Sequence, residues 1–455
     1  MKKIFIYISA IIIIAGCSPK LSSPEVEIAR KYSYSTVENE KPIVENENWW
    51  EIFGDATLNN LIEKALENNQ DALIALSKIE QAYLQYGVDR AAYLPQFSFD
   101  LSAENEYIRP LDNQPEYGIK PTVSWQISLF GALKNATKAA KSDILAQEYN
   151  YNGIMLALTG EVAKSYFSLI QYRQSVEISK VTYKNRLKSM AIIDSLVNYG
   201  MSTSLELKQA KGLTSTAAAA IHQYERAAAK EQSALSILLG ESPRFIATDI
   251  DYSGGYDSLP EYIPSGLPIN LLERRSDIMQ DYALLQAAAA KVGIARAARF
   301  PSISITASGG LISTVLKNLV SSNPYALGWT GLFSVATPIF QFGKLKKSEL
   351  IAVESYEQAI LEYRNTIFTA ISDVENALIS ISTLREQNKM YKELVESNKD
   401  IQFMTSKLYL EGMVDYLNLL DAERTLYSSQ LEYSSLLAQK YSAYVDMFLA
   451  LGGGY

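Results

Sequence analysis

The sequence predicts a mixed α/β, mainly α-helical protein that is internally duplicated and contains four β-strands. One phrase occurs twice, as Arg90-Ala91-Ala92-Tyr93-Leu94-Pro95 and as Arg296-Ala297-Ala298-Arg299-Phe300-Pro301, 206 positions apart. Polar and apolar residues alternate after each copy, and residues 122–242 and 339–455 contain no proline. Because proline breaks helices and the residue before it leaves the α region, each phrase predicts a helix-to-strand boundary and each proline-free stretch predicts long helices.

The alternating stretches predict strands with one apolar and one polar face, since successive strand side chains point to opposite faces. The apolar positions are Phe97, Phe99, Leu101 and Ala103, then Val123, Trp125, Ile127 and Leu129, then Ile303, Ile305 and Ala307. At about ten residues each, such strands are long enough to cross a bilayer at a tilt.

The proline-free stretches predict two long helices, at about 131–198 and 344–410, each followed by a shorter returning helix. Another helix is expected at about 56–92, with Asp55 as its N-cap. A coiled-coil seam is expected where apolar residues step by three and four: Ile360, Tyr363, Ile367, Ile371, Val374, Leu378 and Ile381. Gly200 and Gly412 supply the left-handed residue for the two turns.

The two halves match at a second offset of about 212 residues. Five sets of positions keep this offset: Gly131 and Gly343, Gly200 and Gly412, Leu205 and Leu417, Ala210 and Ala422, Leu239-Gly240 and Leu451-Gly452. We therefore expect two equivalent repeats, 55–242 and 271–455, each of helix, strand pair, long helix and returning helix. The proline-containing segment 243–270 would connect them.

The amino terminus has the pattern of a lipoprotein signal. Lys2 and Lys3 precede an apolar run that ends at Gly16-Cys17, which predicts a signal peptide at 1–16 and lipidation, including palmitate, of Cys17. The alternative is a plain secretory signal with an incidental cysteine. Residues 17–54 would form an extended arm anchored by Trp49 and Trp50. Cys17 is the single cysteine, so no intrachain disulfide can form.

Composition argues against nucleic-acid binding and against catalysis. The formal net charge is −8 and the pI about 5.1, whereas nucleic acid requires clustered Lys and Arg. His222 is the single histidine, and Gly240-Glu241-Ser242-Pro243-Arg244 only partly matches a nucleophile elbow. Most carboxylates lie among Lys and Arg on expected helix faces, as on a solvated surface. We expect no enzyme activity, cofactor or metal.

Four strands with an apolar face cannot close a barrel, and an open sheet edge is not tolerated in lipid. Several copies must therefore pool their strands. Two copies would give eight strands and an interior filled by side chains, whereas three would give twelve strands and a usable lumen. The alternative is a soluble periplasmic coiled coil on which the strand pairs pack.

Three passages carry a family resemblance: Leu271 to Ile278, Val292 to Ser302, and Gly412 to Tyr427. With these residues the chain resembles the TolC-like outer-membrane efflux proteins, in particular the lipoprotein branch that serves RND-type tripartite pumps. Ser276 departs from the proline usual in the family. The resemblance implies a homotrimer with a twelve-strand β-barrel and a twelve-helix periplasmic tunnel, with 243–268 around it.

The resemblance also implies two sets of functional residues. The first set, at the adaptor-contacting turns, comprises Tyr199, Gly200, Met201, Ser202, Glu411, Gly412, Met413 and Val414. The second set, at the periplasmic gate, comprises Tyr409, Leu417, Asp421 and Arg424. Leu417, Asp421 and Arg424 share one face by their i, i+4, i+7 spacing; the alternative is an ordinary exposed Asp421–Arg424 pair, worth about 0.5 kcal/mol.

The expected function is an outer-membrane exit duct, lipid-anchored and with a long periplasmic extension. It would conduct small solutes such as drugs, toxic compounds or metal ions passively from an inner-membrane pump and a periplasmic adaptor. The alternatives are the exit duct of a type I protein-secretion system and a non-conducting lipid-anchored scaffold.

Overall fold

The computed structural model describes residues 32–33, 48–106, 114–243, 274–320 and 327–453. Cys17, the signal peptide, most of the arm and most of the connecting segment lie outside these residues. The chain forms two compact units. We call Ser77–Asn150 with Met279–Thr366 the sheet unit, and Glu27–Leu76, Tyr151–Ile278 and Ile367–Tyr455 the hairpin unit.

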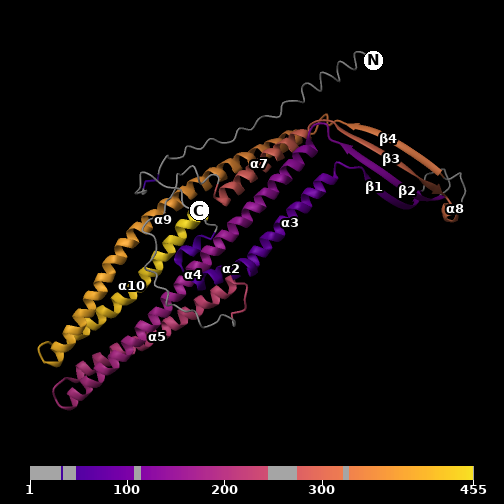
Figure 1. Ribbon diagram of the computed structural model, residues 1–455. Coiled ribbons are helices and arrows are strands. Elements are labelled where there is room, and N and C mark those ends of the chain that lie inside the picture. Colours follow the sequence, from indigo (N-terminus) through magenta and orange to yellow (C-terminus); the bar gives the residue numbers. More distant parts are fainter. Residues whose placement is uncertain (1–31, 34–47, 107–113, 244–273, 321–326, 454–455) are drawn as a thin grey trace. The chain divides into compact units, whose positions relative to one another are not determined.

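The helices of the two halves match in length (Figure 1). Helices α3 (Gln70–Ala91) and α7 (Ser276–Ala297) have 22 residues each. The long helices α4 (Ala132–Asn198) and α9 (Lys344–Leu410) have 67 each, and the returning helices α5 (Ser204–Leu238) and α10 (Tyr416–Ala450) have 35 each. Both predicted offsets, 206 and 212, are therefore kept.

The four strands form one antiparallel sheet in the order β1-β2-β3-β4 (Figure 1). They are β1 (Gln96–Glu106), β2 (Gln114–Ile127), β3 (Ser302–Ser313) and β4 (Leu327–Ala336). Pairing of β2 with β3 joins the two repeats. Two details differ from the sequence prediction: Leu129 lies beyond the end of β2, and the short helix α8 (Leu316–Val320) lies between β3 and β4.

One face of the sheet is apolar and exposed, as the alternation predicts. Cross-strand pairs such as Phe97–Val123 and Ile305–Phe333 lie on this face. Phe97 is 80% exposed and Trp329 86% exposed. The opposite face carries polar pairs, of which Asp100–Lys120 and Ser308–Thr330 are examples.

The predicted helix over 56–92 is interrupted, which corrects the sequence interpretation. Helix α2 (Ala56–Asn68) ends at Asn69, whose backbone is extended, and α3 begins after it. The Asn69 carboxamide oxygen accepts hydrogen bonds from Asp71 N and Ala72 N, so this side chain caps α3. Its Nδ2 donates to Leu238 O at the end of α5. Asp55 caps α2 as predicted, accepting from Thr57 N and Leu58 N.

The core of the hairpin unit lies between its helices and the short 3-10 helix η1 (Trp49–Phe53). Trp49 and Trp50 are buried, as expected for anchors of the arm, and Trp49 stacks on Phe448 at 5.2 Å. The predicted coiled-coil seam is also confirmed: Ile367 and Val374 are buried.

Among the helices that the structure describes, α9 contains an 18-residue window with mean hydropathy 1.2, of which 28% is buried. Core helices of soluble proteins can be as long and as apolar as this window, so the window alone does not assign α9 to a membrane.

Candidate gate and docking turns

The two long hairpins of the hairpin unit end in turns of the same geometry. Gly200 has φ of 71° and Gly412 has φ of 73°, both left-handed. Met201 N donates to Leu196 O at 2.8 Å, and Met413 N donates to Leu408 O at 2.9 Å. These are Schellman-type helix ends, in which glycine adopts the left-handed conformation without a Cβ penalty.

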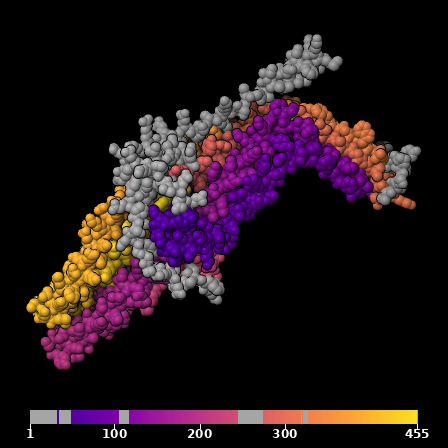
Figure 2. All heavy atoms as spheres, in the orientation of Figure 1, coloured from indigo at the N-terminus to yellow at the C-terminus, as the bar shows by residue number. Residues whose placement is uncertain are grey.

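The returning helices begin at matching N-caps. The Thr203 hydroxyl accepts from Glu206 N, and the Asp415 carboxylate accepts from Asn418 N. Both turns lie uncovered at the same end of the hairpin unit (Figure 2). Exposed apolar side chains lie there, with Tyr199 81% exposed.

The remaining residues of the predicted docking turns are not equally exposed. Glu411 and Gly412 are exposed, whereas Ser202 and Val414 are half-buried. Ser202 Oγ donates a hydrogen bond to Glu206. The surface open to a partner therefore consists of the apolar side chains, the glycine backbone and the Glu411 carboxylate.

Three of the four predicted gate residues share one exposed face of α10. Leu417, Asp421 and Arg424 are exposed, and Arg424 Nη2 lies 3.0 Å from Asp421 Oδ1. The opposite face of the helix is buried through Tyr416 and Leu419. The helix thus presents an apolar side chain and an ion pair away from the core of its own protomer.

The fourth, Tyr409, lies apart from that face. Its ring contacts the ring of Tyr416 at a centroid distance of 5.8 Å. Both belong to an apolar cluster in which Ile193, Ala210 and Leu419 are buried. Burial, together with nearby Glu423, raises the pKa of Tyr416 to about 12. Tyr409 therefore supports the helix that carries the exposed face.

Behind this face lies a polar network that the sequence interpretation did not identify. Arg186 of α4 is 3% exposed, and its Nη1 donates to Leu213 O of α5 at 2.9 Å. Its guanidinium lies 5.1 Å from the ring centroid of Tyr427 on α10. The hydroxyl of Tyr427 is 2.8 Å from Ser179 Oγ. One arginine thus contacts three helices of the hairpin unit.

Glu423 of α10 completes the network by accepting a hydrogen bond from Ser189 Oγ of α4 at 3.1 Å. Burial raises the pKa of Glu423 above its ordinary value, although Ser189 and Arg186 partly oppose this. Burial also lowers the pKa of Arg186. Glu423 is therefore an exception to the expectation that most carboxylates lie on solvated faces, because the packing of α10 on α4 leaves it half-buried.

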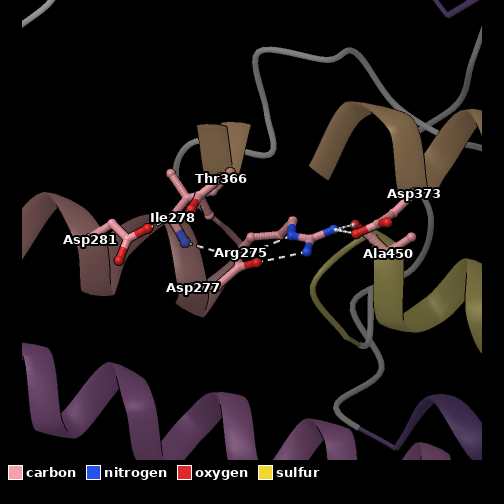
Figure 3. Close-up of polar contacts among 7 residues, drawn as sticks. All are labelled: Arg275, Asp277, Ile278, Asp281, Thr366, Asp373 and Ala450. Carbon is pink, nitrogen blue, oxygen red and sulfur yellow. Dashed lines mark hydrogen bonds and ion pairs between the residues drawn. The ribbon is translucent and has the colours of Figure 1, made fainter. Parts of the chain in front are cut away.

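The passage Leu271 to Ile278 contains a second polar cluster, around Arg275 (Figure 3). Arg275 Nη2 lies 2.7 Å from Asp277 Oδ2, and Nη1 lies 3.0 Å from Asp373 Oδ2 of α9. Nη1 also donates to Ala450 O, at the last residue of α10. Arg275 therefore joins the start of α7 to α9 and α10, a structural role for this part of the sequence.

Comparisons with known proteins assign the chain to a family. The family profile described as outer membrane efflux protein matches residues 61–241 and 267–453. The chain is 30% identical to the probable outer membrane lipoprotein SilC of Salmonella typhimurium over 98% of both chains. It is also 30% identical to outer membrane protein OprJ of Pseudomonas aeruginosa, over 100% of this chain and 97% of that one.

Solved structures show the same fold. The open-state outer membrane channel MtrE of Neisseria gonorrhoeae superposes with a TM-score of 0.83 and 26% identity, over 96% of this chain and 98% of that one. The profile matches both repeats and covers more than half of the sequence. The chain therefore belongs to the outer membrane efflux protein family.

Proposed function

We propose that this protein is the exit duct of a tripartite efflux system, through which solutes pass from the periplasm to the outside. It is an outer-membrane protein of the efflux family, as its relatives are. The observation that carries the duct proposal is the sheet, which has a largely exposed apolar face and a polar face. Lipid would cover the first and water the second.

The proposal requires more than one copy of the chain. Within the described sheet, β1 and β4 are edge strands, and exposed edges are not stable in a bilayer. Three copies would pair β4 of one with β1 of the next and give twelve strands around a lumen. The α4–α5 and α9–α10 hairpins would then contribute twelve helices to a periplasmic tunnel.

The partners follow from the same assembly. We propose that a periplasmic adaptor contacts the two turns, and that an inner-membrane pump supplies the solute. Cysteines at Ser202 and Asp415 test this contact: both should crosslink to the adaptor, whereas crosslinks confined to the sheet unit would place the contact elsewhere.

The cargo class comes from the relatives. Their names describe efflux of toluene and antibiotics, so we propose small toxic compounds as the solute. We propose the exposed α10 face of Leu417, Asp421 and Arg424 as the gate. Three copies would bring three Leu417 side chains and three Asp421 carboxylates together at a constriction.

A lipid anchor at Cys17 completes the proposal, and SilC is itself described as a probable outer membrane lipoprotein. Cys17 lies outside the described residues. Cys17→Ala should abolish incorporation of a fatty-acid probe. It should also reduce the amount of trimer in the membrane, because the several acyl chains of a lipidated Cys17 would anchor the protein firmly, whereas a single chain anchors weakly. Labelling that survives the substitution would exclude the anchor.

Conductance in planar bilayers tests the duct itself. The purified full chain should form discrete conducting channels in a zwitterionic bilayer. A protein that binds the bilayer and forms trimers without conducting would be the lipid-anchored scaffold instead.

A further inference from the structure

The turn from β4 into α9 exposes apolar and basic side chains next to one another. Ile339, Phe340 and Phe342 are 95%, 73% and 85% exposed. Three exposed lysines follow within five residues: Lys344, Lys346 and Lys347. We call these six residues the α9 patch. Together they combine the two kinds of side chain that favour a charged membrane surface.

The backbone of the patch is strained in a way that packing within the protomer does not explain. Phe342 has φ of 49° and is the one non-glycine residue with positive φ in the part of the chain that the structure describes. Its ring contacts Phe340, at 4.7 Å, and is otherwise largely exposed. Strained positions are retained where function requires them, because a glycine would adopt this conformation at lower cost.

In the first repeat, the residue that matches Phe342 is less exposed. Phe130, 212 residues before Phe342, stacks on Phe300 at 4.9 Å and is half-buried. The positions that match Lys344 and Lys347 are Ala132 and Asn135. The exposed aromatic ring and two of the three lysines are therefore specific to the second repeat.

The lysines lie where a helix disfavours positive charge. They occupy the first four residues of α9, whose first turn contains no acidic residue. Within the described residues none of the three forms an ion pair, and the nearby carboxylate of Glu349 is already bound by Arg296 and Arg299. In a chain of net charge −8, this concentration of uncompensated positive charge suits an anion.

The patch also lies at one end of the apolar sheet face. The last described row of that face at this end contains Ile127, Ile303 and Val335. Pro338 and Gln341 of the turn line a cavity of about 610 Å³ at the same end, together with Phe130 and Phe300. The cavity is large enough to accept part of an acyl chain.

We propose that the α9 patch binds the phosphate headgroup of an anionic phospholipid, with the lysine ammonium groups contacting its phosphate oxygens. The rings of Phe340 and Phe342 and the side chain of Ile339 would enter the boundary between headgroups and acyl chains. This inference rests on the proposed function, which makes this end of the sheet a membrane boundary.

Native mass spectrometry of the purified full chain, titrated with phosphatidylglycerol or with phosphatidylcholine, tests the proposal. The combined Lys344→Gln, Lys346→Gln and Lys347→Gln variant should bind phosphatidylglycerol at least about tenfold more weakly, with phosphatidylcholine binding unchanged. The matched control is Lys389→Gln, Lys392→Gln and Lys399→Gln, which removes three exposed charges from the same helix. The control should retain the preference.

Equal losses in both triple variants, or no loss in the first, would overturn the proposal. So would a shift from trimer to monomer in the first variant without a change in lipid preference, because the patch would then contact a second copy. Conductance keeps the two proposals separate. A variant that conducts with unchanged phosphatidylglycerol preference contradicts the lipid site alone, whereas a wild-type protein that does not conduct contradicts the duct.

Phe342→Gly supplies an independent check with effects of opposite sign. Relief of the left-handed strain should raise the thermal midpoint, while loss of the ring should weaken association with vesicles of either lipid. A purely structural role for Phe342 predicts a lower thermal midpoint and unchanged vesicle association, since removing a packed ring destabilises the fold without touching a lipid contact.

Discussion

The α4–α5 and α9–α10 hairpins have the same backbone and different chemistry. Their helices are of equal length and their turns have nearly the same glycine φ angles. On the exposed face, however, Leu417, Asp421 and Arg424 of the second hairpin correspond to Leu205, Gln209 and Gly212 of the first. At these three matched positions, only the second hairpin therefore carries charge.

The buried side differs as well. Arg186 of the first hairpin corresponds to Asn398 of the second, and both are buried. Arg186 contacts α5 and α10 through its Nη1 and its guanidinium plane. Within the described residues, neither Arg186 Nε nor Asn398 Nδ2 has a hydrogen-bond partner. The comparison indicates that duplication supplied the scaffold, and that divergence placed the buried cation on one hairpin and the candidate gate on the other.

The largest expected effect comes from removing the buried cation. Arg186→Met should lower the free energy of unfolding by about 3 kcal/mol, because Leu213 O loses its side-chain donor and Glu423 loses a nearby positive charge. Asn398→Ala at the matching position should change it by less than about 1 kcal/mol. Chemical denaturation measures the free energy of unfolding of the two variants. Equal losses of stability would contradict the proposed difference between the two hairpins.

The next effect should be the same in both hairpins. Gly200→Val and Gly412→Val each introduce a β-branched side chain at positive φ, at a cost of about 1–3 kcal/mol. No atom lies within 4 Å of a Cβ at either site, so strain rather than collision causes the loss. Unequal losses in denaturation would show that one turn packs against something else.

A smaller, pH-dependent effect should appear at Glu423. Its pKa is raised in the folded state, so its contribution favours folding in acid and is lost as the pH rises from about 4.5 through the folded pKa. Glu423→Gln stays neutral and should therefore become more stable relative to wild type as the pH rises. Thermal midpoints of both proteins between pH 4 and pH 8 provide the check, and a constant difference would contradict the raised pKa.

The smallest expected stability effect lies on the exposed face. Asp421→Asn should change the free energy of unfolding by no more than about 0.5 kcal/mol, since its pair with Arg424 is solvent-exposed. A loss above about 1 kcal/mol would mean that Asp421 serves the fold, and the gate assignment would lose its basis.

Much of the architecture could be predicted from periodicity and repetition. The ends of α4 and α9 coincide with local signals, namely Gly200 and Gly412, and the strand faces follow from alternation. The interruption at Asn69 could not be predicted, because the apolar pattern continues through it and the side chain is held by Leu238 O, 169 residues away.

In the candidate site, too, residues marked by a local pattern could be predicted and residues that depend on distant contacts could not. Leu417, Asp421 and Arg424 could be placed on one face by their spacing alone. Arg186 could not, because it lies in the charged stretch Lys184-Asn185-Arg186-Leu187-Lys188, which has the composition of a solvated surface. Its burial depends on α5 and α10, and no local pattern encodes that contact.

The claim that the second hairpin alone carries the gate is tested most directly by single-channel conductance. The Leu417→Ala, Asp421→Ala double variant should show a higher conductance than wild type and weaker block by multivalent cations. The matched Leu205→Ala, Gln209→Ala variant should leave both unchanged, because neither of these two positions carries a charge. Equal increases in the two variants, or no increase in the first, would contradict the account.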